Sequence, residues 1–529
     1  MKKVILGLCI TTLLSSCSDF LEEENRQALT DAIIFRNPES FDQLVANTYA
    51  RARVTTSILD LEQLGTDIYT RGTIVAGIDE LNDYVNLRPF NGALSATWDN
   101  NYFLIAAANT TIDRAETITG LSAEAKAKGI GEVKFFRAMA YFTLVEHFGG
   151  VPLILNEVRS SNVDFARAQE SQVYAQILSD LTDALAAVDE NPSRFGRVSK
   201  SAVRHLRAKV LLTRGYKSFK ANTDFTEAAA LAEEVIAKHP LATNLNALFT
   251  RAGQRNPEVV FSLLYGSNPV NRGVGNNRHL MFKFVYDVYP GMTRSTLYHR
   301  GLGPAPTPFF FELFENGDMR EQVTYRRTLL AEVASPARGV AIGDTVIHFP
   351  KTAWPQSLIA TKKYTVVNPG NYFTPNGITQ VQYPMFRKFD DPGVPYTNPG
   401  INPDGERDAV IMRSAEARLI AAEAYLNAGD RARAAQHINA LRTRAGLTRQ
   451  ITPAEVTIDL ILDESAKELA GEVSRWMELK RTNKLVERAT RHNPHVALNK
   501  ALQAFHLLRP IPNREIDLSG GKIQQNPGY

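Results

Sequence analysis

The sequence predicts a mainly α-helical protein, in which helical hairpins form a scaffold and a long, loop-rich segment is inserted between two of them. Three observations support this fold class. Several stretches place apolar residues three and four positions apart, two Ala-rich stretches resemble each other, and residues 266–405 are rich in Gly, Pro and aromatic residues. Spacings of three and four mark the buried face of a helix, whereas Gly and Pro interrupt regular structure.

The first sixteen residues have the order of a secretory signal peptide. Two lysines precede an apolar run from Val4 to Leu14, and small residues precede Cys17. The run of roughly 11 residues is shorter than the about 20 that a membrane-spanning helix needs, so we expect cleavage instead of a permanent span. The tetrad at 14–17, LSSC, resembles the lipobox of bacterial lipoproteins. Lipidation of Cys17 is therefore predicted, with residues 17–24 as an acidic tether.

Composition limits the classes of function. Lys plus Arg number 60 against 56 for Asp plus Glu, so charge gives no reason to expect a nucleic-acid partner. Hydrophobic residues make up 44% of the chain, which is ordinary for a globular protein with a sizeable core. Cys9 leaves with the signal peptide and Cys17 carries lipid, so packing without disulfides has to hold the exported protein. We expect a globular body tethered to a membrane.

Residues 25–265 form the predicted N-terminal helical region. Apolar spacing indicates helices over 38–53 and 98–118, separated by a long, shaped loop over 65–94 that is rich in Gly, Asp and Asn. A further helix is predicted over 123–148. Gly149, Gly150 and Pro152 follow it and are typical of a helix end.

Two later segments are similar to each other. Residues 202–240 and 415–447 each contain an Ala-rich helix, a turn and a second Ala-rich helix. Their small residues let paired helices approach closely, as in tetratricopeptide-like hairpins: Ala208, Gly215, Ala228, Ala424, Gly429 and Ala435. The second segment belongs to a predicted helical repeat over 407–490, within a C-terminal region over 266–529.

Residues 266–405 form the predicted irregular insertion. Helical periodicity fades there, and two short runs, 345–349 and 363–367, could be strands. They are too few for an independent sheet domain, so we expect the insertion to pack onto the helical scaffold.

The sequence shows no local catalytic or metal-binding pattern. It contains no G-x-S-x-G elbow, no H-E-x-x-H, no phosphate-binding loop and no EF-hand spacing. His492 and His495 fit a solvated loop, and Asp390 and Asp391 fit a turn better than an acid and base pair. We therefore expect no enzyme activity, no cofactor and no metal site, although carboxylates distant in sequence could still converge.

Aromatic residues are the remaining indication of function. A sugar ring presents apolar C–H faces and a rim of hydroxyls, so proteins bind it by stacking an aromatic ring on the face and placing polar side chains at the rim. Four aromatic residues lie in Gly-rich or Pro-rich surroundings and are candidates for stacking, with a core position equally open for each: Tyr84, Tyr289, Tyr298 and Trp354.

Several segments together resemble the SusD/RagB family of outer-membrane lipoproteins, and the resemblance spans the whole chain. The motifs are CSDFLE at 17–22, GEVKFFRAMAYFTLVEHFGGVPLI at 131–154, NPEVVFSL at 256–263, RDAVIMRSAEARLIAAEAYLNAGD at 407–430, INALRTRAG at 438–446, RWMELKRTNKL at 475–485, LRPIPNREIDL at 508–518 and QNPGY at 525–529. This resemblance implies a tetratricopeptide-based scaffold, a lipid anchor in the outer membrane with the body exposed at the cell surface, and a partner, a SusC-like TonB-dependent transporter.

The resemblance also implies a non-enzymatic role in capturing a glycan and delivering it to that transporter. Ligand surfaces of the family draw on segments that correspond to 65–101 and 285–360, which adds Asp79 and Asn101 to the four aromatics as partners for sugar hydroxyls. Three alternatives stay open: capture of peptides, as in RagB-like members; a surface glycoside hydrolase with two carboxylates beside the aromatics; and an assembly protein that binds no ligand.

Overall fold

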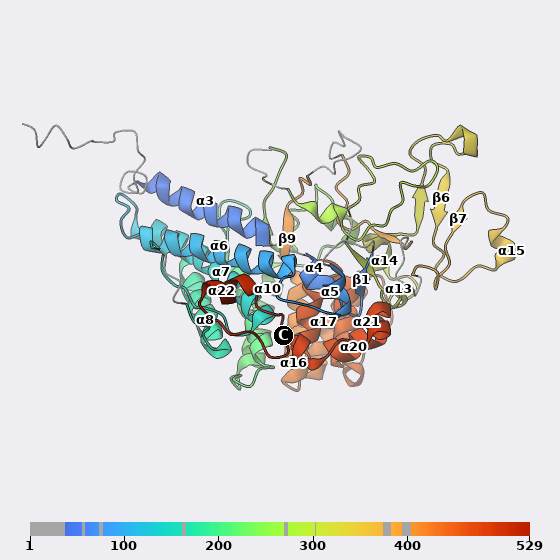
Figure 1. Cartoon of the computed structure of the whole chain (residues 1–529). Coiled ribbons are helices and arrows are strands. Elements are labelled where there is room, and N and C mark those ends of the chain that lie inside the picture. The colour runs from blue at the N-terminus through green and yellow to red at the C-terminus, as the bar shows by residue number, and fades with distance from the viewer. Residues whose placement is uncertain are drawn as a thin grey trace, which may run out of the picture.

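The computed structural model describes residues 37–529, except for 56–58, 73–77, 161–164, 269–272, 274, 302, 374–381 and 394–403. The predicted signal peptide and tether, including Cys17, lie outside the described residues. Helices form the body of the molecule, and an irregular region extends from its side with β6 (Thr345–His348), β7 (Thr365–Val366) and α15 (Gln356–Ile359) at its far end (Figure 1). The predicted fold class is confirmed. No helix within the described part of the chain combines the length and apolarity that crossing a bilayer requires.

The long helices of the N-terminal half pack in chain order, each against the next. They are α3 (Pro38–Thr55), α6 (Gly92–Arg114), α7 (Ala123–Phe148), α8 (Glu170–Ala187), α9 (Lys200–Arg214) and α10 (Asp224–Lys238), with short α4 (Leu59–Gln63), α5 (Ile78–Asp83) and α11 (Leu245–Leu248) between or after them. The largest core of the protein lies among these helices and also includes residues from the C-terminal half, such as Trp476 and Ile511.

Helix α7 confirms the prediction over 123–148. Ser122 caps it by accepting a hydrogen bond from the backbone N–H of Ala125 (3.1 Å). Gly149 ends it with a φ of 74°, a conformation that favours glycine. Helix α6 differs from the prediction over 98–118. It begins at Gly92, where the Asn91 side-chain oxygen accepts a hydrogen bond from the backbone N–H of Ala93, and it ends at Arg114.

The predicted loop over 65–94 contains regular structure as well. It includes helix α5 and strand β1 (Tyr69–Arg71), which pairs antiparallel with β3 (Pro304–Pro306). The partner of β1 lies more than two hundred residues away in the chain, so local sequence could not indicate this strand. The pairing attaches the N-terminal segment to the insertion.

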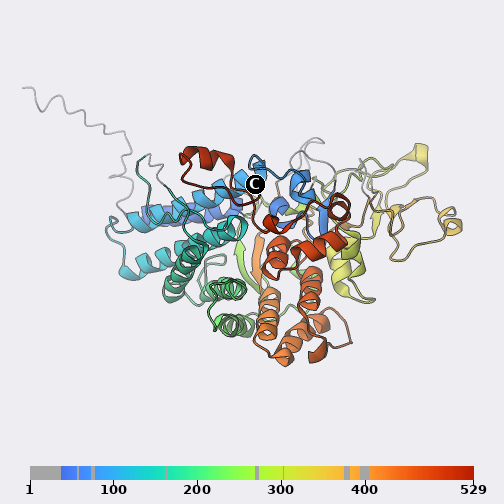
Figure 2. The same cartoon turned by 60° about the horizontal axis from the view of Figure 1, so that its bottom comes forward.

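The two predicted hairpins are α9–α10 and α16 (Ser414–Asn427) with α17 (Arg431–Arg444), and they lie side by side (Figure 2). Helix α10 packs on α16 through a core of small residues: Ala208, Ala228, Ala229, Ala232, Ala421 and Ala424, all buried. A Cβ at Gly215 would come within 2.5 Å of the Phe225 ring, so glycine is needed for the close packing of that hairpin. The predicted close packing is confirmed at Ala208, Gly215, Ala228 and Ala424, whereas a Cβ at Gly429 would meet no atom within 4 Å, and that glycine has a φ of 88° in the turn between α16 and α17.

The insertion leaves and rejoins the scaffold at one place. Strand β2 (Val259–Leu263) pairs antiparallel with β9 (Ala409–Arg413), so the chain returns beside its point of exit. Between them lie η1 (Asn277–Leu280), β3, α13 (Pro308–Glu312), α14 (Met319–Thr324), β4 (Tyr325–Arg326), β5 (Thr328–Leu330), η2 (Pro336–Arg338), β6, α15, β7 and β8 (Met385–Phe386). The possible strands at 345–349 and 363–367 correspond to β6 and β7. An aromatic core fills the insertion, with Phe282 stacked on Phe386 at 4.4 Å.

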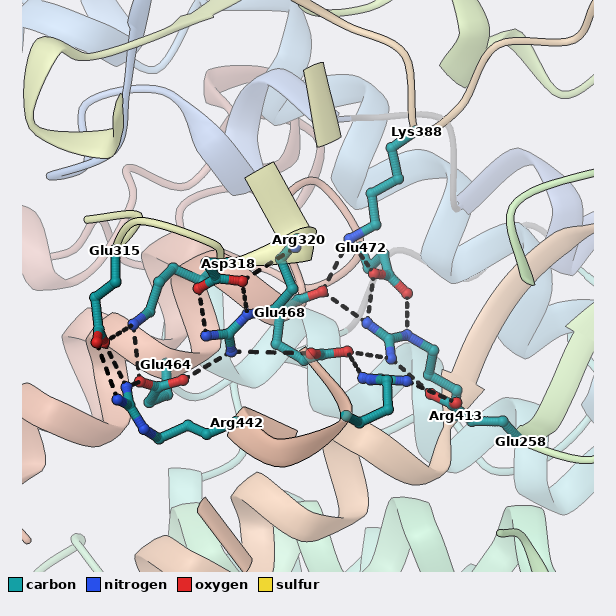
Figure 3. Close-up of polar contacts among 12 residues, drawn as sticks. Glu258, Glu315, Asp318, Arg320, Lys388, Arg413, Arg442, Glu464, Glu468 and Glu472 are labelled. Atoms are coloured by element: carbon teal, nitrogen blue, oxygen red, sulfur yellow. Dashed lines mark hydrogen bonds and ion pairs between the residues drawn. The ribbon is translucent and has the colours of Figure 1, made fainter. Parts of the chain in front are cut away.

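Buried ion pairs join the insertion to the scaffold (Figure 3). The Arg413 guanidinium donates to Glu258 (2.7 Å), Glu468 (2.7 Å) and Glu472 (2.6 Å). Lys388, which lies in the insertion, pairs with Glu472 at 2.5 Å. Burial alone would raise the pKa of Glu472, but Arg413 and Lys388 hold it below its usual value. Glu472 is therefore ionised, and both of its carboxylate oxygens are paired.

A second part of the same network fixes helix α14 (Figure 3). Arg320 donates to Asp318 (2.7 Å) and to Glu464 (2.7 Å), and Arg442 from α17 donates to Glu464 (2.8 Å). Glu464 belongs to α18 (Ile458–Glu468) of the scaffold. Because all four side chains are at most 1% exposed, the contact is dry and sets where the insertion sits.

Residues 505–529 return to the N-terminal half. They follow α19 (Arg475–Arg481), α20 (Leu485–His492) and α21 (Pro494–Asn499), and they include most of η4 (Ala504–Leu507) and all of α22 (Asn513–Leu518). Asn526 donates to the backbone oxygens of Phe148 (3.0 Å) and Arg509 (2.8 Å), and Arg167 donates to Asn526 (2.7 Å). This contact, which we call the C-terminal tie, covers the end of α7.

Candidate ligand-binding surface

The small sheet at the far end of the insertion builds the surface. Strand β6 lies between β5, to which it is antiparallel, and β7, to which it is parallel. Leu329 and Ile347 are paired and fully buried. Since side chains alternate along a strand, the neighbouring pair, Thr328 and His348, faces away from that core. The two are joined by a 2.9 Å hydrogen bond between the Thr328 hydroxyl and His348 Nδ1.

Three rings gather on this side of the sheet, and we call His348, Trp354 and Tyr364 the aromatic platform. The Trp354 ring lies 5.0 Å from the His348 ring at 35°, and the Tyr364 ring lies 6.4 Å from it at 78°. Trp354 and Tyr364 are only half-buried. Burial, with the charge of Arg327, lowers the pKa of His348, so its ring is neutral at pH 7. The platform is an uncharged aromatic surface open to solvent.

The position of Trp354 is fixed by its backbone. Its N–H donates to the Asn368 side-chain oxygen and its carbonyl accepts from the Asn368 amide, both at 2.9 Å. The Lys362 ammonium lies 5.6 Å from the centre of the Trp354 ring. A ring held in this way loses little conformational freedom on binding, which favours stacking of a ligand.

Tyr289 lies near the other end of the same sheet. It is half-buried and lies in the same turn as Gly291. The Gly291 carbonyl accepts a hydrogen bond from the backbone N–H of Glu332 (2.8 Å), which follows the end of β5 by two residues. Burial raises the pKa of Tyr289. Two of the four predicted stacking residues, Tyr289 and Trp354, are therefore brought to one small sheet with part of each ring exposed.

The other two predicted stacking residues do not fit that role in this structure. Tyr84 is 2% exposed, donates to the Gly65 carbonyl (2.9 Å) and packs edge-on against His506. Tyr298 is 4% exposed and its hydroxyl accepts from the backbone N–H of Leu330 (3.3 Å). Both rings are covered by other parts of the protein, so neither presents a face to a sugar.

The predicted hydroxyl partners also have structural roles. Asn101 is buried in α6 and donates to the Thr97 carbonyl (2.8 Å). Asp79 is partly exposed and pairs with Arg71 at 2.9 Å. Neither residue makes a described contact with the aromatic platform. Sequence reasoning missed His348, Lys362 and Asn368; the alternation in 345–349 is the signal that could have placed His348 on an outer face.

Other residues considered for chemistry serve the fold. His492 stacks on Phe309 at 3.6 Å between ring centres, and His495 is buried with its Nδ1 2.6 Å from the Thr70 hydroxyl. The expectation of a solvated histidine loop was wrong, because these residues lie at the junction of α20 and α21, which packs against β1.

The neighbouring carboxylates Asp390 and Asp391 are both engaged. Asp390 accepts from Lys283 (2.6 Å) and Arg326 (2.5 Å), and Asp391 accepts from Arg251 (2.7 Å). Burial would raise the pKa of Asp390, but the two cations lower it, so it holds no proton to donate at neutral pH. Among the described residues, no group of three or more His, Cys, Asp or Glu is placed to hold a metal ion.

Comparison with known proteins identifies the family. A family model described as "SusD family" matches residues 257–529, and one described as "Starch-binding associating with outer membrane" matches residues 19–232. The chain belongs to the SusD family. The resemblance to the SusD/RagB family that the sequence motifs indicated is confirmed.

Individual relatives match over almost the whole chain. "SusD-like protein P2" of Formosa agariphila is 26% identical, with 100% of each chain covered. A solved "Laminarin binding SusD-like protein" shares 24% identity and a TM-score of 0.68, covering 93% of this chain and 100% of that one. "Surface glycan-binding protein A from Bacteroides thetaiotaomicron in complex with laminarihexaose" shares 18% identity and a TM-score of 0.70, covering 93% and 99%. The two solved structures confirm the fold.

Proposed function

We propose that the protein captures a glycan without cleaving it and that the aromatic platform binds the sugar chain. The observation that carries this proposal is the half-exposed Trp354 ring, fixed beside His348 and Tyr364 at the end of the insertion. Rings in this arrangement offer flat apolar faces, and Lys362 and Asn368 offer donors for hydroxyls. Two solved relatives are described with laminarin or laminarihexaose, which makes a β-glucan the first ligand to test.

The test measures binding of laminarin by calorimetry. Trp354→Ala should weaken binding about tenfold or more, since a stacked aromatic contributes roughly 1 kcal/mol beyond the area it buries. Phe103→Ala is the matched control, because Phe103 is a 54% exposed aromatic residue of α6 that lies outside both segments expected to contribute to the ligand surface. Equal affinity of the wild type and Trp354→Ala would place the ligand elsewhere. Release of new reducing ends would contradict the non-enzymatic role, and binding of peptides but of no glycan would favour the peptide alternative.

We also propose that the protein works at the outer membrane, anchored through Cys17 and exposed at the surface, and that it delivers glycan to a SusC-like TonB-dependent transporter. The lipobox-like tetrad and one matching family description, "associating with outer membrane", support the location. Cys17→Ser should move the protein from the membrane fraction to the soluble fraction of the producing cells. Retention of the variant in the outer membrane would contradict the anchor, and co-purification of a barrel transporter with the wild type would support the partnership.

A further inference from the structure

Two hollows meet on another part of the insertion, away from the aromatic platform rings. One has a volume of about 460 Å³ and lies along α14 and β4. The other, of about 790 Å³, lies between α14, residues 387–392 and residues 244–252 of the scaffold, which include α11. Gln322, Arg326 and Arg387 line both hollows, so the two hollows adjoin. Arg327 lines the smaller hollow and Arg251 the larger one, and we call the two hollows together the arginine groove.

Two arginines of the groove share their carboxylates with other cations. Arg326 pairs with Asp390 at 2.5 Å, but Asp390 is also the partner of the buried Lys283 (2.6 Å). Arg327 likewise pairs with Glu321, which it shares with Lys351. Arg251, in contrast, has two carboxylate partners, Asp391 (2.7 Å) and Glu406 (2.9 Å). The incompletely balanced charge therefore lies where the two hollows adjoin, at Arg326 and its neighbour Arg387.

Arg387 is the arginine of the groove whose charge is least balanced. Its side chain is exposed, and its guanidinium has no hydrogen bond or ion pair with any described residue. Its backbone N–H, in contrast, is fixed by the Thr324 carbonyl at 2.8 Å. Partial burial and the nearby Arg326 charge both lower the pKa of Arg387. A bound anion would offset the repulsion between these two guanidinium groups.

The rest of the wall suits a sugar. Asn246 and Gln322 are exposed and offer amide groups, which can bind sugar hydroxyls. Thr328 lines the smaller hollow and hydrogen-bonds His348 of the aromatic platform. The groove therefore reaches the sheet that carries the platform, and one extended chain could contact both.

We propose that the arginine groove is a second binding site, which takes a carboxylate or sulfate group of an acidic glycan through Arg387. This inference rests on the proposed capture of glycans and specifies their class. Guanidinium groups match the geometry of both anions and form charge-assisted hydrogen bonds to them. The site adds specificity for charge to the neutral stacking surface at Trp354.

The experiment compares matched ligands on the mature protein by calorimetry at low salt. Laminarin is the neutral probe, sulfated laminarin carries sulfate esters on the same backbone, and oligogalacturonate carries carboxylates. The wild type should bind at least one acidic probe, with an affinity that falls as NaCl is added. Arg387→Gln should weaken that binding tenfold or more and leave laminarin binding unchanged. The two acidic probes distinguish a sulfate from a carboxylate site.

Arg338→Gln is the control, since Arg338 is an exposed arginine of the insertion that lines neither hollow. Equal weakening by Arg338→Gln would mean that charge acts over the whole surface, and no weakening by Arg387→Gln would mean that the groove is not the site. Either result overturns the inference, as does failure of both acidic probes to bind. Laminarin binding that depends on Trp354 would leave the proposed function standing in each of these cases.

Discussion

Replacing Glu464 by Gln tests whether the buried ion network stabilises the attachment of the insertion. Glu464 is fully buried and accepts from Arg320 (2.7 Å), Arg442 (2.8 Å) and Lys467 (2.8 Å). Burial would raise the pKa of its carboxyl, but Arg320 and Lys467 lower it from 4.5 to about 2. Glutamine has nearly the shape of a protonated glutamic acid and carries no charge, so Glu464→Gln mimics the acid form at every pH.

The expected magnitude follows from the pKa shift. The lowering of the Glu464 pKa from 4.5 to about 2, at 1.36 kcal/mol per pH unit, corresponds to about 3 kcal/mol. Because the pKa is lower in the folded state, this contribution is complete above pH 4.5 and decreases as the pH falls towards 2. We expect Glu464→Gln to reduce the free energy of unfolding by about 3 kcal/mol at pH 7, and the difference from the wild type to shrink by about 2 kcal/mol at pH 3.

Urea unfolding at both pH values measures this difference. The control is Glu487→Gln, which removes a surface ion pair with Lys484 and should cost no more than about 1 kcal/mol. A Glu464→Gln variant as stable as the wild type at pH 7 would refute the reasoning. So would a loss of the same size at pH 7 and pH 3, because it would come from packing and not from charge.

Two further substitutions test packing and burial by the same unfolding measurement. Gly150→Ala should destabilise the protein by about 2 kcal/mol or more, because the new Cβ would lie 2.2 Å from the Ala168 carbonyl oxygen. The control is Gly92→Ala, which should be neutral because the new Cβ would have no atom within 4 Å. Equal losses of stability in the two variants would contradict this account. Asp60→Asn should stabilise the protein by about 3 kcal/mol at pH 7, because burial raises the pKa of Asp60 from 3.8 to about 6. Since the wild type loses stability as the pH rises through that range, the gain should vanish below pH 4, and a gain that persists there would count against the explanation.

Local sequence predicted the helices well because their limits are set by nearby residues. Helix α7 ends where Gly149 adopts a positive φ, and the hairpins need small residues such as Gly215 against Phe225. Helix α6 was misplaced at both ends, since the Asn91 cap lies before the apolar pattern that marked the helix.

The candidate site was predicted only in part, because exposure is set by contacts between distant segments. Tyr84 lies in a loop with turn-forming neighbours, yet His506 and Arg509 cover its ring from the other end of the chain. Trp354 has similar surroundings and remains half-exposed, since the sheet that carries it lies at the far end of the insertion. The residues next to Tyr84 and Trp354 in the sequence therefore do not indicate which of the two side chains is exposed.

The C-terminal tie has a consequence for the order in which the chain folds during synthesis. Residues near position 526 cover the end of α7, and the largest core contains side chains from Ala52 through Ile523. A ribosome-bound chain cannot complete this core until residues 505–529 have been made. A polypeptide that passes through a membrane pore has to remain extended, so late closure would suit a protein that is exported before it folds.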